Sequence, residues 1–207
     1  MCYNNYAAYS GKFTKPETEG NSMHPIEHFK TITRHRHMVM QHCFRAGIPV
    51  QGLLHDLSKY TPTEFIPGAL YWQGTRSPNE AEREKKGYST AWLHHKGRNK
   101  HHFEYWIDVH PVHKVYEPVE MPLRYLIEMF CDRVAASKIY RGENYRDSDP
   151  LDYFLSGMER GRPIHPKTAK QLHFLLKMLA DEGEDKTFAY IRHLLKKQRR
   201  KGCICHK

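Results

Sequence analysis

The sequence predicts an all-α protein, and two observations carry that prediction. Apolar side chains recur at helical spacing over residues 25–46 and 122–140, and no stretch has the alternation of a convincing strand. With 207 residues, the chain is long enough to bury a hydrophobic core without disulfide support. We expect an N-terminal arm (1–23), a helical core (24–145) and C-terminal helices with a basic tail packed on that core (146–207).

The first helix is expected over residues 25–46, with Gly47 as the residue that ends it. Spacings of three and four residues place His35 and Val39 on one apolar face. His37 lies about 200° around the helix from His35, so the two cannot easily serve one site. The apolar neighbours select His35 as the inward-facing histidine.

Pro49 suits the start of a second helix that runs to about Tyr60 and packs antiparallel on the first. His55 and Asp56 sit side by side among its leucines. Burying an unpaired carboxylate destabilises the folded state by roughly several kcal/mol, and a bound divalent cation offsets that cost well. The alternative is a helix-end pair that faces water.

Residues 61–64 match a capping box, which predicts a third helix that reaches Trp72. Glu64 then either completes the capping box or lies near a metal as a proton acceptor. Residues 73–87 are charged and punctuated by glycine and proline, which indicates an exposed loop with a short helix over 79–86.

The sixteen histidines are the main anomaly of the composition, and most of them lie within residues 24–113. Four of them, His94, His95, His101 and His102, fall within nine residues around a glycine. We expect a loop lined with imidazoles between two helical pieces, with at least two of the four as metal ligands.

Apolar residues on nearly all sides of the segment 122–140 predict a central, buried helix. Asp132 lies in the middle of it, next to Arg133. This carboxylate is either half of a structural ion pair or a group that points at a cation.

The last part of the chain predicts a short helix over residues 150–157 and an amphipathic pair, 166–181 and 184–197, around Gly183. No internal repeat is evident.

The formal charge of +10 is concentrated in part at residues 196–201, which hold five basic side chains. Such a tail is either a solvated helix end or a surface for nucleic acid. The fragment 203–206 could bind a soft metal, but a disordered end is the simpler expectation. The odd number of cysteines, with Cys43 and Cys131 in apolar helical patterns, and the absence of a membrane-length apolar run predict a cytoplasmic protein without membrane contact.

In order along the chain, His35, His55-Asp56, the histidine cluster and Asp132 resemble the ligands of the HD-domain superfamily of metal-dependent phosphohydrolases. The interval from His35 to His55 is shorter than that superfamily usually shows. More narrowly, the chain resembles a family of small bacterial and phage-borne HD-like proteins of unknown function. The residues that carry this narrower resemblance are 35–39, 55–60, 64–65, 94–95 and 98–106.

The resemblance implies an HD-like helical bundle with the C-terminal helix pair added to it. It also implies one ion held by four residues, namely His35, His55, Asp56 and Asp132. A second ion would be held by His95 with His101 or His102, bridged by Asp56. Imidazole and carboxylate together suit Mn, Fe, Co, Ni or Zn better than Mg.

The expected function is hydrolysis of a nucleotide or another phosphomonoester by metal-activated water, with Asp56 and Glu64 at the reaction centre. Lys59 and Arg98 are either phosphate-binding groups or solvated surface cations. Two alternatives stay open: an HD-type di-iron oxygenase, and a non-catalytic nucleic-acid-binding module that uses the basic C-terminus. The sequence leaves the oligomeric state open, a homo-oligomer included.

Overall fold

The computed structural model describes residues 22–204, with side chains as far as Arg200, and its helical architecture confirms the all-α prediction. Most of the predicted arm and the side chains of the 203–206 fragment lie outside the described residues. The elements are α1 (Pro25–Ala46), α2 (Pro49–Leu54), η1 (Leu57–Tyr60), α3 (Pro62–Leu70), α4 (Pro78–Lys86), α5 (Thr90–Lys96), η2 (Phe103–Tyr105), β1 (Ile107–Val109), β2 (Tyr116–Pro118), α6 (Leu123–Arg141), η3 (Gly142–Asn144), α7 (Asp149–Glu159) and α8 (Pro166–Ile204).

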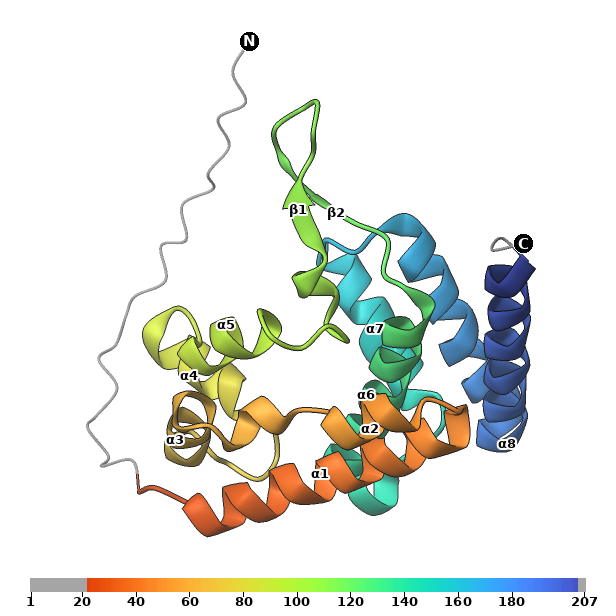
Figure 1. Cartoon of the computed structure of the whole chain (residues 1–207). Helices are drawn as coiled ribbons and strands as arrows, with labels where there is room; N and C mark the ends of the chain where they lie inside the picture. The colour runs from red at the N-terminus through yellow and green to blue at the C-terminus, as the bar shows by residue number, and fades with distance from the viewer. Residues whose placement is uncertain (1–21, 205–207) are drawn as a thin grey trace.

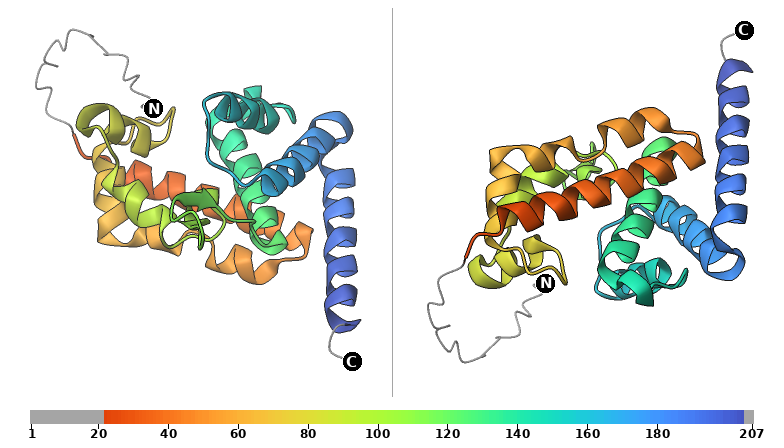
Figure 2. Two further views of the ribbon diagram at one scale, coloured as in Figure 1. Left: turned by 90° about the horizontal axis from the view of Figure 1, so that it is seen from above. Right: turned by 90° about the horizontal axis from the view of Figure 1, so that it is seen from below.

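The long helix α1 runs along one side of the molecule and packs on α2, α3 and α6 (Figures 1 and 2). It begins at a proline and ends where Gly47 adopts φ 85°, as the sequence predicts. Helix α6 crosses α1, and α3 packs on α5 on the other side of the site. Together α1, α3, α5 and α6 surround the predicted ligands.

A single apolar core joins α1, α6, α7 and α8, so the predicted C-terminal helices share the core of residues 24–145. Phe130 of α6 and Phe188 of α8 are both fully buried and meet edge to face. Burying one such ring contributes on the order of 1.5–3 kcal/mol, which makes this pair a main tie between the two parts.

Helix α8 is two helices joined at Gly183, whose φ of 81° and ψ of 174° are non-helical. This break confirms the predicted pair, and Figure 2 shows the change of direction. Just beyond it, Glu184 pairs with Arg45 of α1 and Lys138 of α6. The ion pairs fix the second half of α8 against the body.

Four local predictions were wrong. No strand was expected, yet β1 and β2 form a short antiparallel hairpin that extends away from the helices (Figure 1). The third helix ends at Leu70 rather than Trp72, and no side-chain hydrogen bond from Thr61 caps it, so the capping box is not formed. The helix expected to run from Pro49 to Tyr60 stops at Leu54.

Candidate metal centre

The chain changes direction at the His55-Asp56 pair, between α2 and η1. Asp56 adopts φ 53° and ψ 27°, a left-handed conformation that aspartate tolerates better than most residues. Such a conformation typically costs about 1–3 kcal/mol and is found most often at functional sites. In a continuous helix the two side chains would diverge by about 100°, whereas here both reach the same interior space.

The first cluster consists of His35 from α1, His55 and Asp56 from this bend, and Asp132 from α6. Oδ1 of Asp132 lies 2.9 Å from Nε2 of His35 and 3.5 Å from Nε2 of His55. Nε2 of His55 lies 3.3 Å from Oδ2 of Asp56. The four residues predicted for one ion therefore come together in the fold.

The second cluster consists of Asp56, His95 from α5, and His101 and His102 from the loop before η2. Oδ1 of Asp56 lies 3.3 Å from Nε2 of His95 and 3.4 Å from Nε2 of His101. Nε2 of His95 and Nε2 of His102 are 2.9 Å apart. Asp56 belongs to both clusters and turns one oxygen toward each.

These clusters fit a divalent ion. Ligand atoms that each lie about 2.0–2.2 Å from an ion are separated from one another by roughly 3–3.5 Å, which matches the distances in both clusters. Among the described residues, three buried atoms here have no hydrogen-bond partner: Nε2 of His55, Nε2 of His101 and Oδ1 of Asp56. Buried polar atoms are normally satisfied, so these three are well suited to hold a cation. Oδ2 of Asp56 faces the ammonium group of Lys59.

Glu128 of α6, which was not among the predicted site residues, contacts histidines of both clusters. Its Oε1 lies 3.0 Å from Nδ1 of His55 and 3.2 Å from Nδ1 of His101. A carboxylate on the far nitrogen of a ligand histidine fixes the orientation of the ring. The signal was available, because Glu128 precedes Asp132 by four residues and shares its helix face.

Glu64 has the same relation to the second cluster. Its two oxygens lie 2.6 Å from Nδ1 of His94 and 2.7 Å from Nδ1 of His95. Both oxygens are engaged by histidines, so Glu64 is placed to orient His95 rather than to accept a proton. Within the pair, His95 belongs to the cluster and His94 stands outside it.

The charges within the site support one another. Burial would raise the pKa of Asp56, but the charges of His55 and Lys59 hold it well below its usual range. Burial would likewise raise the pKa of Asp132, but its hydrogen bond with His35 and the proximity of His55 keep that pKa well below its usual range. Burial opposes protonation of His55, yet the charge of Asp56 and its carboxylate partners raise its pKa well above the ordinary value. The ionised, buried carboxylates of Asp56 and Asp132 thus favour a positive charge between the two clusters.

The two predicted phosphate-binding cations have different positions. Nζ of Lys59 lies 2.7 Å from Oδ2 of Asp56, at the edge of the first cluster. Arg98 is exposed, and its guanidinium donates to the carbonyl oxygen of His94 at 3.4 Å. The structure therefore brings Lys59 to the site and leaves the guanidinium group of Arg98 at the surface.

Comparison with known proteins gives one result. A family model described as "Family of unknown function (DUF5662)" matches residues 24–178, which is more than half of the chain and includes every residue of both clusters. No curated protein and no solved structure matches the chain. In the described part of the chain, no helix is long and apolar enough to cross a membrane.

Proposed function

The chain belongs to the DUF5662 family, and on the geometry of its two clusters we propose that it is a metal-dependent phosphohydrolase that acts on a nucleotide or another phosphomonoester. We also propose that it is a distant relative of the HD-domain superfamily. The observation that carries the proposal is the position of Asp56, whose two oxygens face two separate groups of histidines.

The donor set determines which ions are suitable. Each cluster offers nitrogen from imidazole and oxygen from carboxylate, a mixture that favours Mn, Fe, Co, Ni or Zn. When bound, one or two such ions supply an acidified water and neutralise charge on a phosphoryl group.

The residues of the chain have three tasks in this proposal. Glu128 and Glu64 hold the ring planes of their histidines. The ammonium group of Lys59 can donate hydrogen bonds to a phosphate oxygen, because it lies beside Asp56 and part of the side chain is exposed. The burial of Asp56, His55 and His101 keeps bulk water from the reacting groups.

Hydrolysis of phosphomonoesters tests the proposal. Protein loaded with Mn is expected to release phosphate from p-nitrophenyl phosphate or from members of a nucleotide and sugar-phosphate panel. Asp56→Asn is expected to lower the rate by about a hundredfold or more, because it weakens both clusters. Asp152→Asn changes an exposed aspartate of α7 and is the matched control. No phosphate release from any substrate with any of the five metals would contradict the proposal.

A di-iron oxygenase is the second candidate, and the three imidazoles of the second cluster favour it. Iron content together with oxygen consumption separates the two enzymes. A hydrolase loaded with Mn or Zn needs no oxygen, whereas an oxygenase is inactive with either metal.

The non-catalytic nucleic-acid module remains a third candidate. The side chains of Lys196, Lys197, Arg199 and Arg200 are exposed at the end of α8, which suits an anionic partner.

A further inference from the structure

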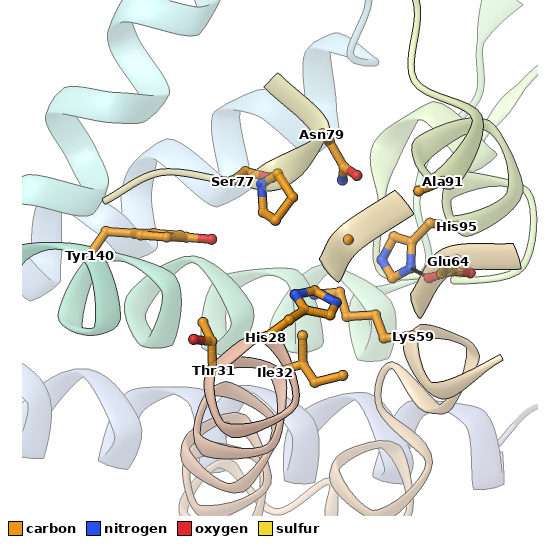
Figure 3. A pocket seen from close by; sticks show the side chains of 12 residues that line it. His28, Thr31, Ile32, Lys59, Glu64, Ser77, Asn79, Ala91, His95 and Tyr140 are labelled. Carbon is orange, nitrogen blue, oxygen red and sulfur yellow. Dashed lines mark hydrogen bonds and ion pairs between the residues drawn. The ribbon is translucent and has the colours of Figure 1, made fainter. Parts of the chain in front are cut away.

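Beside the second cluster lies a cavity of about 70 Å³, formed between α1, α3, α4 and α6. Lys59, Glu64 and His95 stand at one end of it, and Tyr140 stands at the other (Figure 3). The cavity therefore continues directly from the proposed site of phosphate chemistry.

His28 forms part of its wall. The side chain is 6% exposed, and its Nδ1 is buried without a hydrogen-bond partner among the described residues. The ring packs so closely on α3 that a Cβ added at Gly68 would lie 2.2 Å from Nε2 of His28. A buried, unpartnered ring nitrogen beside a cavity has free capacity to bind a ligand.

The remaining wall is uncharged and combines polar with apolar groups. Ser77 and Asn79 border the cavity, and the hydroxyl of Tyr140 points across it (Figure 3). Ile32 and Ala91 add small apolar surfaces. Charged groups occur only at the end next to the metal clusters.

The size of the cavity restricts what can enter. An engineered cavity of about 150 Å³ holds benzene, so this one can enclose a fragment of about three to four carbon atoms but not a whole nucleobase. Its hydrogen-bonding groups match hydroxyl groups, which both donate and accept.

We infer that this pocket binds the hydroxylated, uncharged part of a small phosphomonoester, a polyol phosphate of about three to four carbons, whose phosphate lies at Lys59 and the second cluster. This inference rests on the proposed function and selects among its substrates. It places a small polyol phosphate ahead of nucleotides.

The test is the binding of phosphonates, which cannot be hydrolysed, measured by titration calorimetry on Mn-loaded protein. The probes are methylphosphonate, 3,4-dihydroxybutylphosphonate and the phosphonate analogue of AMP. The dihydroxybutyl compound is expected to bind about tenfold tighter than methylphosphonate, since each good hydrogen bond contributes about three- to tenfold. The AMP analogue is expected to bind no tighter than methylphosphonate.

Two variants test whether the tighter binding of the dihydroxybutyl compound comes from this cavity. Gly68→Ala drives His28 into the cavity and is expected to abolish the tenfold gain while methylphosphonate binds as before. Tyr140→Phe removes one hydroxyl from a partly exposed side chain, which cannot unfold the protein, and should cost about threefold. His37→Ala, on the exposed face of α1, is the control and should change nothing.

The outcomes are distinct. An AMP analogue that binds tighter than the polyol compound, or a gain that survives both variants, overturns the inference and leaves the proposed function intact. A Gly68→Ala protein that loses methylphosphonate equally also overturns it. Failure of methylphosphonate to bind the wild type at all contradicts both the inference and the proposed phosphohydrolase.

Discussion

Oε1 of Glu128 lies 3.0 Å from Nδ1 of His55, and the same oxygen reaches a histidine of the second cluster. One buried carboxylate thus orients ligands of both clusters. The two clusters therefore share an orienting carboxylate, Glu128, in addition to the shared ligand Asp56.

Replacing Glu128 by glutamine should weaken both ion sites together. Loss of a carboxylate behind a ligand histidine typically costs about 10–100-fold in metal affinity. Titration against a chromophoric chelator measures each affinity. Glu143→Gln, at an exposed position, is the matched control. Loss of one ion with full retention of the other would contradict the linkage.

Replacing Glu64 by alanine should affect the second cluster alone, because Glu64 contacts His95 and no ligand of the first cluster. We expect the metal content to fall from about two ions to about one. Plasma mass spectrometry after gel filtration gives this number. A variant that retains both ions at wild-type affinity would show that His95 needs no orienting partner.

His42 should make stability depend on pH. It is buried against Phe188, and burial lowers its pKa from 6.5 to about 4. The unfolded chain therefore binds more protons than the folded chain between pH 6.5 and pH 4. The contribution of neutral His42 is complete above pH 6.5 and is lost as the pH falls through this window, on the order of 3 kcal/mol in all.

The measurement compares urea unfolding of wild type and His42→Leu in a chelating buffer from pH 7 to pH 4. The wild type should lose more of its free energy of unfolding than the variant over this range. The His37→Gln variant should follow the wild type. Parallel curves for wild type and His42→Leu would show that His42 does not titrate as described.

Removing residues 196–207 should leave the fold and the metal content intact. Among the side chains of α8 that the structure describes, Leu195 is the last buried one, and the cations from Lys196 to Arg200 are exposed. We expect a change of about 0.5 kcal/mol or less in the free energy of unfolding, and unchanged hydrolysis. A truncated chain that loses binding to duplex DNA but keeps its metal would instead favour the nucleic-acid module.

The sequence predicted the elements whose ends carry local signals. Helix α1 matches because a proline opens it and Gly47 closes it, and Gly183 marks the break in α8. The bend at Asp56 could not be predicted, since a left-handed aspartate is held by contacts across the fold rather than by its neighbours in sequence. The strands of the hairpin are three residues each, too short for a periodic pattern.

The site was predictable as a set of residue types but not as an arrangement. Spacing on α1 selected His35 over His37, and the structure places His35 in the first cluster. The choice between His94 and His95 depends on the packing of α3 against α5, which places Glu64 between the two rings. Glu128 was not predicted, although its spacing of four residues from Asp132 places both on one face of α6.

Metal content per chain shows whether the two clusters bind ions. Plasma mass spectrometry on wild type, on the paired His55→Ala/Asp56→Ala variant and on Asp152→Asn compares the site with an exposed control. We expect about two first-row ions in the wild type and the control, and almost none in the paired variant, with its helical circular dichroism retained. A wild type that stays metal-free after incubation with Mn, Fe, Co, Ni and Zn would contradict this expectation.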